Sequence, residues 1–138
     1  MPITYVIDQM TNLVRTTVTG AISVQDIIGH LAAQRRNQTV SSREFVDVTG
    51  VTPPYLTSSQ IWQAAQAALG VVLDADAGPR AIYVSNEPVF GMCRMFSTLV
   101  EDTFPIRVFR DPSQAEHWLF EEFQIDATGA SGADSAAR

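Results

Sequence analysis

Residues 81–100 read AIYVSNEPVFGMCRMFSTLV, and this stretch decides the fold class. It begins with an apolar run at 81–84, which is typical of a buried strand, and Ser85-Asn86 then supplies turn chemistry. Pro88 suits the first position of a helix. Behind it, apolar side chains recur at helical spacing as far as residue 100. The stretch is therefore predicted to form a strand, a turn and an amphipathic helix, the repeating unit of an α/β domain.

The same alternation of strands and helices extends on both sides of this unit. Residues 3–8 and 13–19 are rich in β-branched side chains and are joined by a short link, which predicts an antiparallel hairpin. Two further strands are expected at 45–48 and 106–109, and Gly50 to Pro54 is expected to be a loop. Three more helices are expected to begin after capping residues at Ser23, Thr57 and Asp111.

The resulting order of elements is β-β-α-β-α-β-α-β-α. It predicts an α/β domain with a mixed sheet, whose N-terminal hairpin is antiparallel and whose later strands are parallel, covered by packing helices. A chain of 138 residues is the size of one domain, and we place that domain at residues 1–125. Residues 126–138 are mostly small and polar, which predicts a disordered tail.

Composition excludes several classes of function. The formal net charge is −6 and every Lys or Arg position is an arginine, which argues against nucleic acid as a partner. No apolar run approaches the roughly 20 residues of a membrane span. The N-terminus lacks the pattern of a signal peptide, and the single cysteine, Cys93, excludes an internal disulfide. These features favour a cytoplasmic protein.

The sequence contains no recognisable catalytic or cofactor motif. There is no glycine-rich phosphate loop, dinucleotide fingerprint or serine elbow, and no cofactor is expected. The two histidines, His30 and His117, fall in different predicted helices and are expected to be solvated, so no metal site is predicted. Cys93 lies on an apolar helical stripe and is expected to pack in the core. We therefore expect no catalytic residues and a protein that is not an enzyme.

A candidate binding site follows from the expected sheet. In open α/β sheets, ligands bind beyond the carboxyl ends of the strands. Polar side chains end several predicted strands, others begin the next helices, and an aromatic side chain beside an arginine offers an apolar contact. This rim comprises Asp47, Thr49, Thr57, Ser58, Ser85, Asn86, Phe90, Arg94 and Arg110. The capping and turn roles of several of these residues are the alternative interpretation.

Four motifs of the sequence resemble those of the SpoIIAA-like family, which has the fold of sulfate-transporter and anti-sigma-factor-antagonist (STAS) domains. The resemblance covers about residues 3–123 and is structural in character. The matching residues are Asp47-Val48-Thr49-Gly50, Ala81 to Ser85, Val89 to Phe96, and Val108 to Asp111 followed by Ala115 and Trp118-Leu119. The resemblance implies a four- or five-stranded sheet backed by helices, often as a homodimer.

The resemblance also implies a regulatory role. The antagonist relatives are not enzymes; they bind a kinase-like anti-sigma partner and are switched by phosphorylation of a serine within an Asp-Ser-Ser-Gly motif. The corresponding residues here are Asp47-Val48-Thr49-Gly50, followed by a Pro-Pro loop. Thr49 matches the phosphorylated serine by motif, and Ser58 or Ser59 matches it by position at the start of a helix.

Two functions from different classes remain open at this point. A third, an enzyme that uses Asp47 with Arg94 or Arg110, is disfavoured because no nucleophile is paired with a base in the sequence. The first is a non-enzymatic STAS-like interaction module that binds a protein partner. The second is a binding protein for a small apolar or amphipathic ligand, with its pocket at the carboxyl rim of the sheet. The apolar side chains near the rim, such as Phe90 and Met92, motivate the second.

Overall fold

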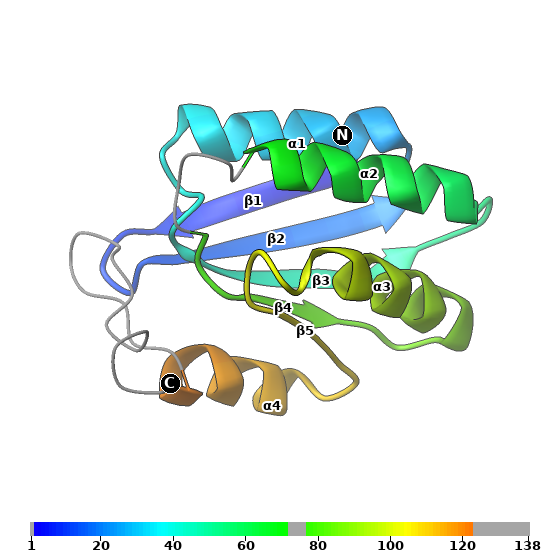
Figure 1. The fold of residues 1–138 in the computed structure, drawn as a ribbon. Coiled ribbons are helices and arrows are strands. Elements are labelled where there is room, and N and C mark those ends of the chain that lie inside the picture. The colour runs from blue at the N-terminus through cyan, green and yellow to red at the C-terminus, as the bar shows by residue number, and fades with distance from the viewer. Residues whose placement is uncertain (1, 72–76, 123–138) are drawn as a thin grey trace.

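The computed structural model describes residues 2–71 and 77–122 and has one five-stranded sheet with helices on both faces (Figure 1). The predicted order of elements is confirmed. The strands are β1 (Ile3–Asp8), β2 (Leu13–Gly20), β3 (Arg43–Val51), β4 (Arg80–Tyr83) and β5 (Ile106–Phe109). The helices are α1 (Val24–Arg36), α2 (Ser58–Val71), α3 (Glu87–Val100) and α4 (Pro112–His117), and a π-helical turn, η1 (Trp118–Glu122), follows α4.

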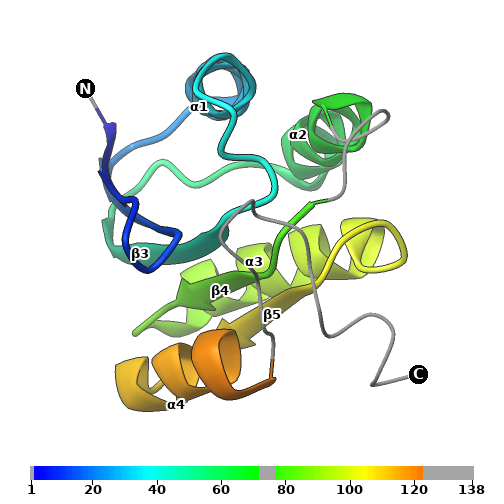
Figure 2. The ribbon, with the colours of Figure 1, turned by 90° about the vertical axis from the view of Figure 1, so that its left-hand side faces the viewer.

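The strands lie in the sheet in the order in which they occur in the chain. β1 pairs with β2 antiparallel, as the hairpin prediction required, and every later pairing is parallel. β5 is an edge strand whose Arg107 is exposed, which agrees with the role of charged side chains at sheet edges. Right-handed crossovers in a sheet of sequential order place all their helices on one face. Accordingly, α1, α2 and α3 lie along one face and α4 lies on the other (Figures 1 and 2).

Each of the four helices begins where a polar side chain caps its first turn. Ser23 and Asp26 form a capping box at the start of α1. Thr57 and Gln60 form the same arrangement at α2, where the Gln60 amide hydrogen bonds to the Thr57 hydroxyl. Asn86 and Asp111 cap α3 and α4, each followed within two positions by proline. The helix starts were therefore predictable, because a cap is made by residues close in sequence.

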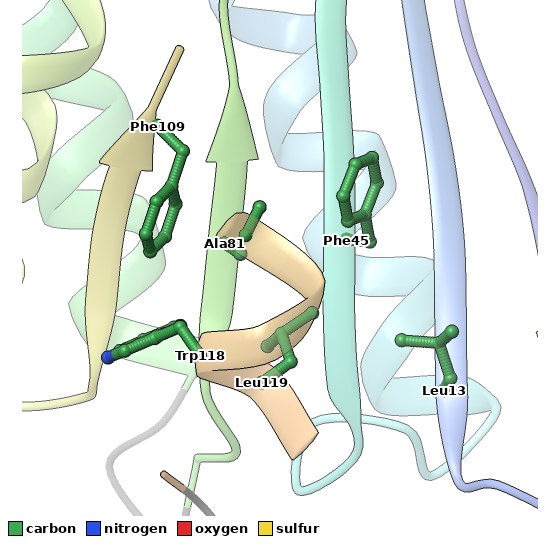
Figure 3. Close-up of a cluster of buried hydrophobic side chains, with 7 residues drawn as sticks. Leu13, Phe45, Ala81, Phe109, Trp118 and Leu119 are labelled. Carbon is green, nitrogen blue, oxygen red and sulfur yellow. The ribbon is translucent and has the colours of Figure 1, made fainter. Parts of the chain in front are cut away.

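The face covered by α4 carries an aromatic core (Figure 3). Phe109 and Trp118 pack with ring centroids 5.7 Å apart, and Ala115 and Leu119 are fully buried beside them. In β4, β5 and the first half of β3 the odd-numbered side chains point to this face, whereas the even-numbered ones point to α1, α2 and α3. The pairing of β2 with β3 is irregular near Thr17, and beyond it Val51 packs beside Val48 on the face of α1, α2 and α3. The buried side chains of the α4 face are Leu13, Phe45, Ala81, Phe109, Ala115, Trp118 and Leu119.

Three local predictions need correction or lie outside the described residues. The strand predicted at 45–48 runs from Arg43 to Val51, because its parallel pairing with β2 continues through Gly50, which is not in a loop. The strand predicted at 81–84 begins one residue earlier, at Arg80. The predicted tail at 126–138, and with it the end of the domain at residue 125, lies outside the described residues.

None of the helices described for residues 2–71 and 77–122 is long and apolar enough to cross a bilayer.

Candidate ligand-binding site

A cavity of about 170 Å³ lies between the sheet and the three helices α1, α2 and α3. Its walls are almost entirely apolar. The sheet contributes Val18 from β2, Val46 from β3 and Ile82 from β4, while the helices contribute side chains such as Ile61 and Phe96. These side chains point inward from the sheet and from the helices, so the cavity is a gap between the two packed layers.

One end of the cavity is polar. Glu44 is the second residue of β3 and Arg80 is the first residue of β4. They are paired in the register of the sheet and point to the same face. Both are buried, with 3% and 7% of their surface exposed. Charged side chains at such positions are costly to bury unless other groups satisfy them. The cost of burying Glu44 and Arg80 therefore depends on the groups that contact them.

The Glu44 carboxylate has three partners, each from a different element. The Thr16 hydroxyl of β2 donates to Oε2 at 2.6 Å, and Nε2 of His30 in α1 lies 2.8 Å from the same oxygen. Nε of Arg80 lies 3.4 Å from Oε1. Both carboxylate oxygens are therefore engaged by protein groups.

This environment changes the acidity of Glu44. Burial alone would raise the pKa of its carboxyl group. The hydrogen bond with His30, the positive charge of Arg80, the charge interaction with His30 and the hydrogen bond from Thr16 outweigh burial and lower the pKa to about 2. Glu44 is therefore ionised at neutral pH, although it is buried.

The remaining donors of Arg80 go mainly to backbone carbonyls. Nη1 donates to the Gly78 carbonyl at 2.6 Å and to the Ser42 carbonyl at 3.3 Å, and Nη2 lies 3.5 Å from Oε1 of Gln34. Because a guanidinium only donates, the contact with Gln34 identifies which end of the Gln34 amide is the oxygen. The amide nitrogen of Gln34 is consequently the end directed away from Arg80.

Two polar atoms among the cavity-lining residues lack a partner among the described residues. They are Nδ1 of His30 and Nε2 of Gln34, both buried. The two residues are four apart on α1, so their side chains are neighbours on one face of that helix. Buried polar atoms are almost always hydrogen-bonded, and these two are enclosed by protein, so they leave the wall of the cavity apolar.

Cys93 also lines the cavity, from α3, and packs against the apolar core as predicted. Burial raises the pKa of its thiol to about 12. The thiolate is the reactive form of cysteine. Cys93 therefore acts as a small apolar wall residue at neutral pH.

The polar end of the cavity was missed by the sequence analysis, and the prediction for His30 was wrong. We expected a solvated side chain, but only 12% of the His30 side chain is exposed, and its ring also packs edge-on against Tyr5 at 5.6 Å. The sequence did contain a signal for this buried polar cluster: Glu44 and Arg80 are charged residues directly before the strands predicted at 45–48 and 81–84. His117, in contrast, is exposed as predicted.

Four of the nine predicted rim residues have side chains in local hydrogen bonds, and none of the nine lines the cavity. Asp47 accepts hydrogen bonds from the backbone amide and the hydroxyl of Thr49, at 2.9 and 2.7 Å. Thr57 and Asn86 are helix caps, as the alternative interpretation held. Ser58 is the first residue of α2 and, like Ser85, is exposed.

Three of the rim residues form one cluster. The Phe90 ring has the guanidinium of Arg110 at 4.0 Å and that of Arg94 at 5.8 Å from its centroid. Arg110 also pairs with the Glu87 carboxylate at 2.8 Å. We call these residues the Phe90 cluster. It lies at the carboxyl end of β5 and the first turns of α3, and none of its members lines the cavity.

The described residues provide no metal site: within 2–71 and 77–122, no three His, Cys, Asp or Glu side chains come close enough to hold an ion. The polar end of the cavity has one carboxylate and one imidazole, which already contact each other.

Comparison with known proteins places the fold. No family model matches the sequence, and no curated protein matches it. The structure is similar to the crystal structure of an uncharacterised protein from Shewanella loihica PV-4, of the DUF3478 family and with a SpoIIAA-like fold. The TM-score is 0.56, with 15% identity over 85% of this chain and 93% of that chain. The chain therefore has a SpoIIAA-like fold, which confirms at the level of fold the resemblance drawn from the sequence.

Proposed function

We propose that this protein is a non-enzymatic binding protein for a small, mainly apolar molecule held in the cavity between the sheet and α1, α2 and α3. The observation that carries the proposal is the cavity itself, about 170 Å³ with apolar walls. An apolar cavity of roughly 150 Å³ in another protein stays dry and binds benzene. A ligand about the size of one aromatic ring is therefore the expected occupant. The site lies beneath the helices, whereas the sequence led us to expect it at the rim.

The chemistry of the cavity supports binding without catalysis. The Cys93 thiol is held protonated by its high pKa, and the Glu44 carboxylate is too weak a base, at a pKa of about 2, to deprotonate a hydroxyl group. The Thr16 hydroxyl donates its proton to Glu44, and the His30 imidazole contacts the same carboxylate oxygen rather than the hydroxyl. No nucleophile is therefore paired with a base among the described residues that line the cavity.

Binding of benzene, followed by NMR or calorimetry, tests the proposal. We expect benzene to bind the native protein and to shift the methyl signals of wall residues. Ala64 is buried in α2 and lines the cavity, so the Ala64→Leu substitution fills part of the space. This variant is expected to bind benzene at least about tenfold more weakly.

The matched control is Ala67→Leu, which adds the same side chain to the same helix. Ala67 is half-buried and does not line the cavity. This variant should bind benzene as the native protein does. The proposal fails if the native protein does not bind benzene, or if both variants affect binding equally.

A second candidate is a STAS-like regulatory module that binds a protein partner and acts as a homodimer. The Phe90 cluster favours it, because an aromatic ring between two arginines has the composition of binding hot spots. Trp62, 53% exposed on α2, is a further aromatic contact on the surface. The phosphorylation sites suggested by the resemblance are Thr49 and Ser58.

This second candidate has a separate test. Analytical ultracentrifugation of the native protein should show a dimer, and the Thr49→Asp or Ser58→Asp substitution should weaken a dimer or partner complex. The Ser85→Asp variant is the control, since Ser85 is an exposed rim residue that matches neither phosphorylation site. A monomer whose partner binding is unaffected by these substitutions contradicts this candidate.

A further inference from the structure

We propose that two copies of this protein associate through the outer edge of β1, so that one continuous sheet runs through both copies. The two β1 strands pair antiparallel about a two-fold axis at Tyr5. This inference goes beyond ligand binding in the cavity. It rests on the homodimer of the second candidate function and assigns the interface of that dimer.

Exposed apolar side chains are concentrated in and directly after β1. Four of the six exposed large apolar side chains among the described residues lie here: Tyr5, Val6, Ile7 and Met10. Val6 is 71% exposed and Met10 is 97% exposed. Apolar side chains gathered on one part of a surface are typical of an interaction site.

The outer edge of β1 also lacks the features that keep edge strands apart. β5, at the opposite edge, is only four residues long and carries the exposed Arg107. β1 is six residues long and has no charged side chain before its last residue, Asp8. No other described helix or strand lies beyond it (Figure 2). A strand of this kind offers its outward backbone groups to another strand.

The pairing with β2 identifies which backbone groups of β1 point outward. The Thr19 amide donates to the Pro2 carbonyl at 2.8 Å, so these two residues form a hydrogen-bonded pair of the β1–β2 ladder. In an antiparallel ladder, every second residue directs its amide and carbonyl to the neighbouring strand. The even-numbered residues of β1 therefore face β2, and the amides and carbonyls of Ile3, Tyr5 and Ile7 point outward.

A two-fold axis at Tyr5 satisfies all of these outward groups at once. Tyr5 then pairs with Tyr5 of the second copy, and Ile3 of each copy pairs with Ile7 of the other. In any other register, Ile3 or Ile7 would have to pair with a residue outside β1. An edge that is complementary to itself in this way forms a closed, two-fold dimer.

The charges of β1 are compatible with a second copy as the occupant. The chain has a formal net charge of −6, so most parts of two copies repel each other. Asp8 is the only charged side chain of β1. In the proposed register it lies opposite Pro2 of the second copy, so no two carboxylates face each other.

α1 adds charge complementarity to this arrangement. The His30 ring packs against the Tyr5 ring at 5.6 Å, so the middle of α1 lies beside the two-fold axis. The axis makes the α1 helices of the two copies run in opposite directions. The acidic first turn of one, with Asp26, is then directed towards the basic last turn of the other, with Arg35 and Arg36. This match favours a second copy over a strand of an unrelated protein.

Analytical ultracentrifugation of the full-length protein over a range of concentrations tests the interface. The native protein should dimerise, and Val6→Lys should weaken the dimer about tenfold, because it places a lysine from each copy at the paired edge. The control is Trp62→Lys, which exchanges another exposed apolar side chain for lysine on α2 and should leave the dimer unchanged.

Cross-linking tests the register. Thr4 lies opposite Val6 of the second copy in a pair without mutual hydrogen bonds, where the Cα atoms are about 4.5 Å apart, a distance that a disulfide spans. The double variant Thr4→Cys/Val6→Cys should therefore form a covalent dimer with oxidised glutathione, seen by intact mass. The control Thr17→Cys/Thr19→Cys places exposed cysteines on the same face of β2, and it should remain uncross-linked.

Amide hydrogen exchange followed by NMR needs no substitution. The amides of Ile3, Tyr5 and Ile7 should exchange more slowly as the protein concentration rises, because they become hydrogen-bonded only in the dimer. The amides of Thr4 and Val6 already face β2 and are the internal control.

The outcomes separate this interface from the homodimer and from the cavity. A dimer that Val6→Lys leaves intact, with outward amides that do not respond to concentration, overturns the β1 interface while the homodimer stands. Equal cross-linking of the two double variants also overturns it. A protein that is monomeric at every concentration overturns both the interface and the homodimer. The benzene experiment tests the cavity independently of all these results.

Discussion

Glu44 is the residue on which the interior of this protein depends most. It is a buried, ionised carboxylate that joins β2, α1 and β4 through Thr16, His30 and Arg80. A buried ion pair adds little stability compared with apolar residues of the same size, but removing one partner leaves the other charge uncompensated. Arg80 is such a partner, because it is only 7% exposed.

The substitution Glu44→Gln should therefore destabilise the protein strongly. Glutamine keeps the shape of the side chain but leaves Arg80 buried without its counter-ion. We expect the free energy of unfolding at pH 7 to fall by about 3 kcal/mol. Urea denaturation followed by circular dichroism measures this change.

The control for this prediction is Glu87→Gln, which breaks the ion pair with Arg110 on the surface. Both side chains of that pair are more than half exposed, so the loss should be below about 1 kcal/mol. Equal losses in the two variants would contradict the role given to burial.

Gly78 is a second residue whose identity is constrained by its surroundings. A Cβ atom at this position would lie 2.3 Å from the Ser42 carbonyl oxygen and 2.5 Å from that of Ser41. The Gly78 amide also donates to the Val40 carbonyl at 3.0 Å, which holds this segment against the loop before β3.

The substitution Gly78→Ala is expected to lower the free energy of unfolding by about 3 kcal/mol, because backbone atoms must move to admit the methyl group. Thermal denaturation detects such a loss. Gly91→Ala is the matched control: Gly91 lies in α3, and a Cβ there meets nothing within 4 Å. Alanine should stabilise that helix by about 0.5–1 kcal/mol. A neutral Gly78→Ala variant would disprove the close contact.

At the scale of elements, α3 illustrates how a local signal specifies a helix. Its first turn is capped by Asn86, whose side-chain oxygen accepts a hydrogen bond from the Val89 amide at 3.0 Å. Pro88 lies in the first turn, where its missing N–H group costs nothing. Both features could be recognised in the sequence, because they involve residues at most three positions apart.

Removing this cap should destabilise the protein by a predictable amount. The Asn86→Ala substitution leaves the Val89 amide without its side-chain partner, and we expect a loss of about 1 kcal/mol. Urea denaturation provides the measurement. Ser85→Ala, at the adjacent exposed position, should change stability by less than about 0.5 kcal/mol. If the two variants are equally stable, the cap contributes nothing measurable.

At the scale of the whole molecule, the buried polar cluster makes stability depend on pH. The pKa of Glu44 is lower in the folded protein, at about 2, than its ordinary value of 4.5. Between these values the unfolded chain binds more protons than the folded chain, so acid favours unfolding. The stabilisation is fully present above about pH 4.5 and is lost as the pH falls towards 2.

We expect this effect to account for about 3 kcal/mol of stability over that range. Urea midpoints measured at pH 5, 3.5 and 2.5 should fall steeply for the native protein and less steeply for Glu44→Gln. The Glu116→Gln variant, which removes an exposed partner of Arg15, should follow the native curve. Parallel curves for the native protein and Glu44→Gln would show that another group controls acid unfolding.

The fold was largely predictable, whereas the candidate site was not. The strands, the helices and the antiparallel hairpin follow from hydrophobic periodicity and from capping residues, which act over a few positions. The rim residues were chosen by a general rule for parallel sheets. The structure shows four of the nine in local hydrogen bonds and three in the Phe90 cluster. The cavity lies between the sheet and the helices, because its walls are formed by strands together with α1, α2 and α3.

The sequence by itself determined the order of the elements, the start of each helix and the resemblance to SpoIIAA-like proteins, because these depend on neighbouring residues. Only the tertiary structure decided the order of strands in the sheet, the cavity and the contacts of Glu44. His30 and Thr16 reach the same carboxylate from 14 and 28 positions away along the chain. Such contacts depend on how α1 crosses the sheet and on the register of β2, β3 and β4, which no local pattern specifies.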